Sequence, residues 1–423
     1  MVMAAKPAVA QEETSVLPHG IFRTWAIFAA GGSEYKFNPQ GKREGLAHML
    51  NRSVSMLDLE STLQNSKDPQ ALNTSKQLKD LRTELNNFGS GVGSPKLGDN
   101  LFQSDLYADA QADVMQFVFA LEYGLTPKLS VGLAAPLMWY DIQANFNTAS
   151  QDSFHSVMHT VKGTPLESKV KQFAQQAPTS ATFRKSIFTD QGYYEPSATK
   201  IFGLSDLEGG VKYRAFESTY VDSSLLFGFR LPTGTHKKDP RNLLDQSIGD
   251  GQLDLAFQAS VDFKITPHLI FLSSAKYTFQ TPDRELVVGK PKGSTAPLPD
   301  LTDLNSYDFA NRKLGNIWEM NFNLRYYMFQ HRVALISAYI FQNKFADSYS
   351  GDNPVLDYAA LSRNTDTQTH ATELFLIYST VADYMRGQKA FPFEVSVTYH
   401  HTLAGRNAPD LNYGYARMKF FFN

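Results

Sequence analysis

Long runs of alternating apolar and polar residues constrain this chain more than any other feature of its sequence. In LDLAFQASVDFKI, residues 253–265, every odd position is apolar and most even positions are polar or charged. Residues 314–326 and 391–399 repeat the pattern. Such runs are about twice the usual strand length, and one face is charged throughout. Strands of about 9–11 residues or more with this alternation are typical of transmembrane β-barrels.

The alternation therefore predicts an all-β fold, a transmembrane antiparallel up-and-down β-barrel of about 12 strands. The predicted strands lie near residues 20–31, 104–124, 128–146, 202–216, 219–231, 250–265, 267–281, 312–329, 331–345, 368–386, 390–404 and 411–423. Every second connection is short, and the others are long, which is how outer-membrane barrels are built. A change of phase in the second strand predicts a bulge at 113–116.

A tight corner occurs twice, as EYGLTPKLSVGL from Glu122 and as DFKITPHLIFL from Asp262. Proline presets φ for a reversal and cannot donate to a strand ladder, so each corner predicts a periplasmic turn. An even number of strands then places both termini in the periplasm. In the last strand, Arg417 and Lys419 are expected to face the lumen. The positions expected to face lipid there are Gly414, Ala416, Met418, Phe420 and Phe422.

Composition excludes several other classes of protein. The chain has 423 residues, a formal charge of −2 and no cysteine, which excludes disulfides and thiolate sites and gives no electrostatic case for nucleic acid. No run of apolar residues is long enough for a transmembrane helix. Residues 20–423 are expected to form one barrel. Residues 1–19 contain Ala8-Val9-Ala10, which fits either the remnant of a secretory signal or a tail of small residues.

Two long loops, 38–103 and 147–201, are expected to carry amphipathic helices. Leu46, Met49, Leu50, Val54 and Leu57 recur at helical spacing, Pro69 begins a second helical run that stops at Gly89, and Thr164-Pro165 precedes a third. Such helices could cap the barrel mouth, enter it as a constriction, offer a docking surface for another protein, or simply pack on one another.

The polar face of the strands gives a set of residues expected to line the lumen. The acidic members are Glu122, Asp206, Glu208, Asp254, Asp262, Glu319 and Glu394, and the others are Lys212, Arg214, Arg230, Lys264, Lys276, Arg325, His400, Arg417 and Lys419. Ion-selective pores have rings of charged side chains of one sign. The nearly equal numbers of acidic and basic residues here instead predict ion pairs inside a narrow barrel. Twelve strands permit either a narrow path or a filled lumen.

An enzyme is not expected. Ser and His need an orienting acid or amide in shared geometry, and neither His155-Ser156 nor His400-His401-Thr402 indicates one. Adjacent strand residues point to opposite faces, so His400 and His401 cannot hold one metal. No metal site and no cofactor are predicted.

Three stretches resemble the recurrent hairpins of a family of outer-membrane proteins. EYGLTPKLSVGLAAPL (122–137), GLSDLEGGVKYR (203–214) and LLFGFRLPTGT (225–235) are similar to the family named for the meta-pathway of phenol degradation, and more distantly to long-chain fatty acid channels. The likeness covers roughly residues 105–280. It implies inward passage of hydrophobic or aromatic small molecules. Because few residues precede the first predicted strand, we do not expect the N-terminal hatch of the fatty acid channels.

The expected function is a porin-like transporter in the outer membrane of a Gram-negative cell, gated by the helical extracellular loops. Its expected partners are outer-membrane lipid or lipopolysaccharide, a small hydrophobic solute and, through the loops, another protein. The alternative is a closed barrel that anchors or docks a partner protein.

Overall fold

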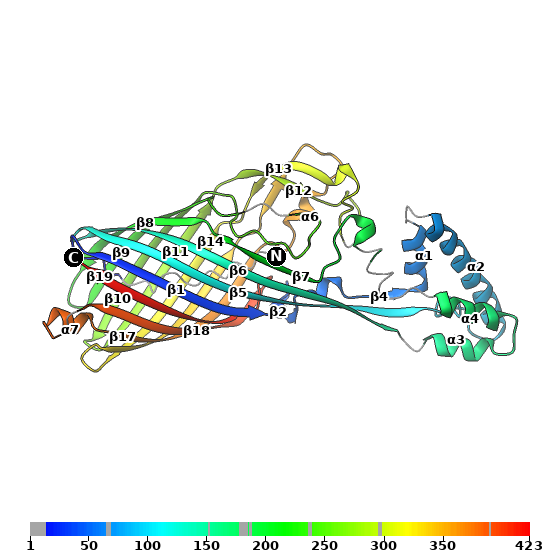
Figure 1. Ribbon diagram of the computed structural model, residues 1–423, viewed down its shortest axis with the longest axis horizontal. Coiled ribbons are helices and arrows are strands. Elements are labelled where there is room, and N and C mark those ends of the chain that lie inside the picture. The colour runs from blue at the N-terminus through cyan, green and yellow to red at the C-terminus, as the bar shows by residue number, and fades with distance from the viewer. Residues whose placement is uncertain are drawn as a thin grey trace.

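A closed barrel of 12 antiparallel strands forms most of the molecule (Figure 1). The computed structural model describes residues 14–64, 69–150, 153–176, 185, 188–235, 239–294, 298–388 and 391–423. The barrel strands are β1 (Phe22–Ser33), β5 (Gln103–Thr126), β6 (Leu129–Ser150), β8 (Leu207–Glu217), β9 (Val221–Leu231), β10 (Asp254–Thr266), β11 (Leu269–Gln280), β14 (Ile317–Met328), β15 (Val333–Lys344), β17 (Thr367–Ser379), β18 (Phe393–Arg406) and β19 (Asn412–Phe422). The predicted fold is confirmed.

The first and last strands close the barrel. β1 pairs with β19 from Phe22 opposite Phe422, and its other edge pairs with β5. Both ends of the barrel chain therefore lie at the end with short turns, where Figure 1 marks the C-terminus.

The repeated corner is built in the same way at both places. Each has a register shift just before the turn, between Gly124 and Thr126 and between Lys264 and Thr266. In each, the threonine hydroxyl accepts a hydrogen bond from the backbone N–H two residues on, at 3.2 Å. Threonine and proline together thus define the turn, as the repeat predicted.

The bounds of three strands differ from those predicted. The strand expected at 202–216 is divided at Ser205 and Asp206 into β7 (Ala198–Leu204) and β8, which pair with successive parts of β6. The strand expected at 312–329 is divided into β13 (Tyr307–Lys313) and β14. The strand expected to reach 386 stops at Ser379, and a helical turn, α7 (Val381–Met385), follows.

The bulge predicted at 113–116 is wrong. β5 pairs in unbroken register with β1 and β6 through this stretch. The outward positions change from Gln111 and Asp113 to Met115 and Phe117, while the inward positions stay in phase. The change in polarity therefore marks the level at which the outer wall becomes apolar.

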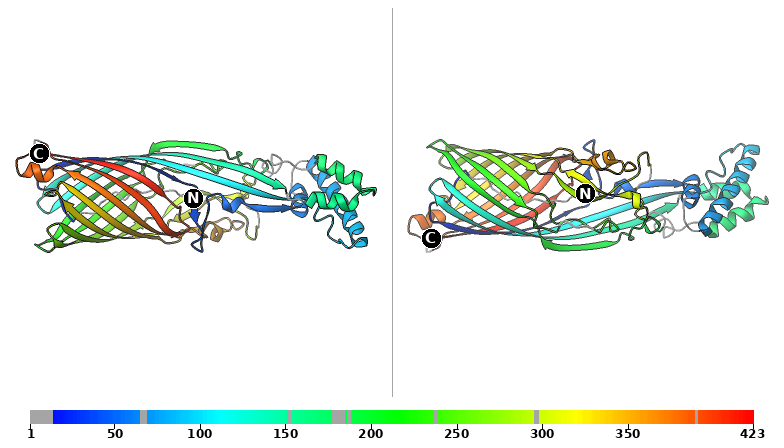
Figure 2. Two further views of the ribbon diagram at one scale, coloured as in Figure 1. Left: turned by 90° about the horizontal axis from the view of Figure 1, so that it is seen from below. Right: turned by 90° about the horizontal axis from the view of Figure 1, so that it is seen from above.

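β5 and β6 continue beyond the barrel as a stalk. β1 ends opposite Ala112, so residues 103–111 of β5 pair only with β6 and β4 (Arg52–Ser55). At about 3.3 Å per residue this stalk is roughly 30 Å long. At its end lies a head in which the described residues form four helices: α1 (Met56–Gln64), α2 (Pro69–Gly91), α3 (Ser153–Val161) and α4 (Leu166–Gln176). All three views show the head beyond the barrel (Figures 1 and 2).

The head has its own apolar core. Met56, Leu85, Val161 and Val170 have no or almost no exposed surface, and α1 packs on α2. Helices beginning at Pro69 and after Pro165 were predicted correctly. The helix expected over 46–57 is wrong. In that stretch only His48–Leu50 forms a 3-10 helix, and the chain then pairs with β5 as β4.

Smaller elements surround the long-loop end of the barrel. They are β2 (Tyr35–Phe37), β3 (Arg43–Gly45), β12 (Asp283–Val288), β16 (Ser348–Ser350), α6 (Tyr358–Ser362) and the 3-10 turns at Thr189–Gln191 and Leu304–Ser306. β12, β13 and β16 form a separate small sheet above the β11–β14 hairpin.

Candidate functional site: the barrel interior

The two faces of the barrel wall differ in chemistry. Phe257, Leu374 and Val397 point outward and are each more than half exposed, whereas their neighbours Gln258 and Thr398 are buried inside. An apolar outer wall on a closed barrel is the property that allows strands to span a bilayer. None of the helices in the described residues is long and apolar enough to cross a membrane.

Several of the charged residues predicted from the strands form ion pairs. Arg230 contacts Asp254 and also Asp250 (2.6 Å), and Lys264 contacts Asp222 (2.8 Å). Glu394 lies 2.7 Å from Lys419 and 4.0 Å from Arg417. Arg23, which was not predicted, contacts Glu122. Opposite charges therefore neutralise one another along this wall, rather than forming a ring of one sign.

Other predicted residues have polar partners that the sequence did not identify. His400 Nδ1 lies 2.9 Å from Glu373 Oε1, and its ring stacks on Tyr413 with centroids 4.3 Å apart. Glu319 accepts hydrogen bonds from the amides of Asn321 and Gln342, both at 3.2 Å.

The remaining predicted residues are placed by the strand register or by local contacts. Arg325 donates to the Tyr327 hydroxyl at 3.0 Å. Lys276 lies opposite Glu319 and Gln258 in the register, Glu208 opposite Arg230, and Lys212 opposite Leu226.

Asp206 lies in the break between β7 and β8 and is almost fully buried. Its carboxylate accepts hydrogen bonds from the backbone N–H groups of Gly234 (2.9 Å) and Asp250 (3.1 Å). It therefore ties two loop segments to the break in the strand, a role that the alternation of the sequence did not indicate.

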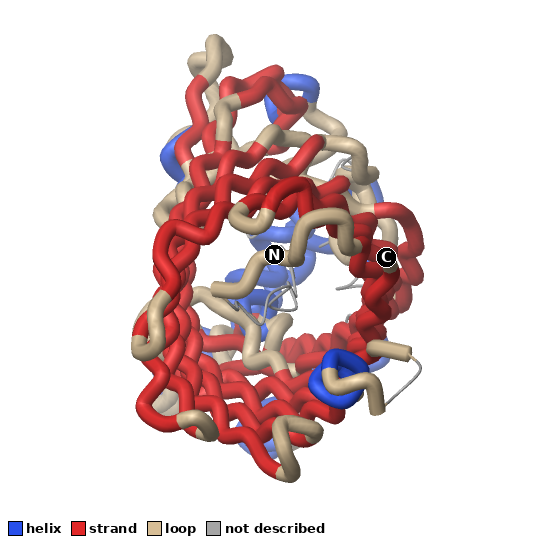
Figure 3. Tube along the Cα trace, turned by 90° about the vertical axis from the view of Figure 1, so that its left-hand side faces the viewer, coloured by secondary structure: helices blue, strands red, loops and turns tan. Residues whose placement is uncertain are grey.

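The segment before β1 runs across the barrel at the short-turn end (Figure 3). Thr14 donates to Asp262 (2.8 Å), and the N–H of Leu17 donates to Ser130 Oγ (2.8 Å). Arg214 donates to the carbonyl of Val16 and also contacts Glu217 at 2.5 Å. Val16 and Leu17 are buried. The sequence led us to expect no segment of this kind in the lumen, because a short stretch without periodicity gives no signal. The Ala8-Val9-Ala10 pattern lies outside the described residues.

A cluster of buried apolar side chains packs together in another part of the barrel interior, and it was missed. It comes from β1, β5, β15, β17 and β19 and includes Trp25, Ile27, Val118, Ala334, Ile336, Phe375, Ile377 and Tyr415. By contrast, β10, β11 and β14 present Gln258, Ser260, Ser274, Asn321 and Asn323 as buried polar side chains. The signal was present in β5, where Val118 and Ala120 alternate with Phe117 and Phe119, so that both faces are apolar.

The long-loop end carries a polar network rather than the helical head. Arg312 contacts Asp283 (2.6 Å) and Glu285, and it donates to the carbonyl of Asp250 (2.6 Å). Gln252 also donates to Asp283, at 2.8 Å. The helices of the head lie at the far end of the stalk instead of over this opening (Figure 1). Their position gives no support to the expectation that they gate the barrel.

Together these features define the class: a transmembrane antiparallel β-barrel whose interior combines a cluster of apolar side chains with paired charges and polar side chains. No family model and no curated protein matches the sequence. Among solved structures, the chain is similar to the COG4313 outer membrane channel from Pseudomonas putida F1, with 10% identity and a TM-score of 0.49 over 98% of this chain and 100% of that one.

Two further similar structures are the CymD monoaromatic hydrocarbon channel and the TodX deltaS2S3 mutant monoaromatic hydrocarbon channel. CymD shows 8% identity and a TM-score of 0.33 over 96% of this chain and 90% of that one. TodX shows 9% identity and a TM-score of 0.32 over 96% and 91%. At these identities the description of the barrel rests on its own strand pairing.

Proposed function

We propose that this barrel is an outer-membrane channel for small hydrophobic or aromatic solutes. The observation that carries the proposal is the apolar part of the inner wall, to which five strands contribute. A path for ions or sugars needs polar groups all round, whereas ring-like or aliphatic solutes gain free energy from contact with apolar side chains. Ile336, Phe375 and Val118 are buried within the cluster in this structure, so a solute has to separate them in order to pass. The paired charges are assigned to the lining of the same path, where they leave little net field.

The segment at residues 14–18 is assigned as the gate of this path. Its contacts with Asp262, Ser130 and Arg214 are hydrogen bonds that can break and re-form without disturbing a strand pair. A solute leaving at the short-turn end has to displace this segment. The gate is thus at the opposite end from the helical head, and no movement of the head is required.

Uptake by proteoliposomes tests the proposal. Ile336→Gln and Val118→Gln place an amide on the apolar wall, and each is expected to slow the uptake of a nonpolar aromatic such as naphthalene about tenfold, because the solute loses apolar contact along its path. Asn321→Gln on the polar wall is the matched control and should transport as the unaltered barrel does. Equal naphthalene uptake by all these variants would contradict a path along the apolar wall.

A second function is favoured by the head. The helices α1, α2, α3 and α4 share a buried core on a stalk roughly 30 Å long, an arrangement that suits the display of a surface to another protein. In that case the barrel would also serve as an anchor. Removal of the head would then abolish retention of the partner by the barrel while leaving solute uptake intact.

A further inference from the structure

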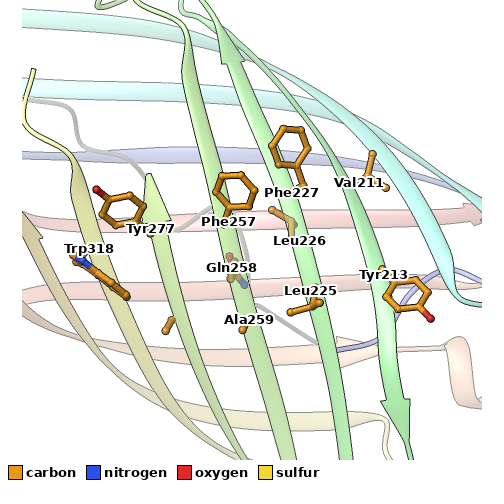
Figure 4. A pocket seen from close by; sticks show the side chains of 11 residues that line it. Val211, Tyr213, Leu225, Leu226, Phe227, Phe257, Gln258, Ala259, Tyr277 and Trp318 are labelled. Atoms are coloured by element: carbon orange, nitrogen blue, oxygen red, sulfur yellow. The ribbon is translucent and has the colours of Figure 1, made fainter. Parts of the chain in front are cut away.

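A hollow of about 590 Å³ opens on the outer wall of the barrel, over β8, β9, β10, β11 and β14 (Figure 4). It arises from a step in side-chain size between two neighbouring rows of the strand register. In one row, Phe227, Phe257, Tyr277 and Trp318 lie opposite one another in turn on β9, β10, β11 and β14. The next row has Leu225, Ala259 and Ala275 on the first three of these strands and Met320 on β14. The rings form a ledge, and the alanines form the floor beneath it.

The surroundings of the hollow fix what can enter it. None of the residues that line it carries a charge. It opens on the apolar outer wall, where Phe257 is 54% exposed and Trp318 39% exposed. Water gains too few hydrogen bonds on such a surface to fill it, so its occupant must be hydrocarbon. The volume lies in the range of specific ligand sites, about 300–1,000 Å³.

The bilayer itself supplies the most abundant hydrocarbon at this position. An acyl chain is narrow and flexible enough to pass beneath a ledge of rings, whereas the broad wall of a second barrel would bridge the ledge and leave the floor uncovered. Solutes dissolved in the membrane are far more dilute than acyl chains, so mass action favours the chain.

We propose that this outer hollow is a lipid site that holds one acyl chain of a membrane lipid beneath the aromatic ledge, on the floor made by Ala259 and Ala275. The site is separate from the interior path and does not depend on the proposed transport function. It makes part of the lipid shell a specific, slowly exchanging ligand of the barrel.

Trp318 allows the site to be tested by fluorescence, since the chain has only three tryptophans. The full chain, purified in detergent, is titrated with a phosphatidylethanolamine whose acyl chains are brominated, because bromine quenches a tryptophan in contact with it. The difference between the intact chain and Trp318→Phe isolates the quenching of Trp318. Excess detergent dilutes unspecific lipid, so the site should saturate near one lipid per barrel.

Filling the floor should remove the site. Ala275→Phe and Ala259→Phe are each expected to weaken the saturable quenching about tenfold or more. Ala416→Phe is the matched control, because Ala416 is an outward alanine on β19, between Val397 and Phe28 and far from the hollow in strand order. Heat-modifiable migration confirms folding, and if one floor variant does not fold, the other reports on the same hollow.

Two results would overturn the proposal. One is quenching that rises linearly with the lipid-to-detergent ratio in the intact chain and in the floor variants alike, which would mean bulk lipid contact only. The other is saturable quenching by 1-bromonaphthalene that expels the brominated lipid, which would mean that the hollow takes aromatic solutes instead.

Discussion

At the residue scale, Asp206 shows how a buried carboxylate can hold a barrel wall together where a strand breaks. It sits between β7 and β8 and accepts hydrogen bonds from two loop N–H groups. Glycines surround it because a side chain there would collide: a Cβ on Gly249 would lie 2.5 Å from Asp206 Oδ1. The aspartate of the stretch GLSDLEGG is thus explained by local packing against the two loop segments that contain Gly234 and Gly249.

Replacing Asp206 should therefore destabilise the barrel. Asp206→Ala leaves both N–H groups buried without an acceptor, and we expect the free energy of unfolding to fall by about 2–3 kcal/mol. Asp206→Asn keeps one acceptor oxygen, so its free energy of unfolding should lie between that of the unaltered chain and that of Asp206→Ala. Urea unfolding in detergent micelles measures both. An unchanged midpoint for Asp206→Ala would show that the two loop segments are held by other contacts.

At the element scale, the stalk and its head behave as a unit distinct from the barrel wall. Within the head, Arg82 contacts Glu60 (2.6 Å) and Asp99 (3.1 Å), and Asn86 donates to Asp99 at 3.0 Å. The hydrogen bond from Asn86, with Arg82 nearby, holds the pKa of Asp99 below its ordinary value of 3.8. This network joins α2 to the segment that leads into β5.

The pH dependence of the head follows from the direction of that shift. A carboxyl whose pKa is lowered by folding contributes stability that is fully present above its unfolded pKa and is lost as the pH falls through the folded pKa. We expect the thermal transition of the helices, followed by circular dichroism at 222 nm, to move to lower temperature below about pH 4. Asn86→Ala removes the hydrogen bond that lowers the pKa of Asp99, so the decrease in transition temperature on acidification should be smaller in this variant. An equal decrease in both proteins would contradict the assignment.

Removal of the head tests whether it gates the barrel. Ser55 and Gln103 are paired neighbours on β4 and β5, so residues 56–102 can be replaced by an Asn-Gly turn, and 153–176 by a short Gly-Ser linker. Because the head lies beyond the stalk, naphthalene uptake by proteoliposomes should stay within about twofold of the intact chain, a free-energy change of only about 0.4 kcal/mol. A large increase on removal would restore the head as a gate.

At the scale of the whole molecule, side-chain periodicity predicted the strands and turns that form the barrel. It predicted few of the side-chain contacts inside it. The alternation in residues 253–265 predicted β10 closely, and the Thr-Pro corners predicted the turns. Pairings such as His400 with Glu373 depend on which strands become neighbours and at what register, which no single strand encodes. The segment around Thr14 and Leu17 is too short for any period, and Val54 was assigned to a helix because pairing with β5 was not foreseen.

The same scale explains why the apolar interior was missed. β1 and β5 have apolar residues on both faces, which weakens the alternation of apolar and polar residues in their sequences. A weakened alternation is a weaker strand signal and is not by itself evidence of apolar side chains inside the barrel. Strict alternation assigns apolar residues to lipid and polar residues to the lumen, so it cannot predict apolar side chains inside the barrel. Those apolar side chains and the segment that crosses the barrel together form the basis of the proposed transport path.

One measurement tests the path and its gate most directly. The backbone N–H of Leu17 donates to Ser130 Oγ at 2.8 Å, so the two residues are neighbours, and the sequence has no cysteine. Leu17→Cys with Ser130→Cys is therefore designed to form a single disulfide that fixes the segment in the lumen. We predict that the oxidised double variant takes up naphthalene into proteoliposomes at least about tenfold more slowly than after reduction, while Leu17→Cys alone responds to neither treatment. Equal uptake before and after reduction, with the disulfide verified by mass spectrometry, would contradict the proposed path.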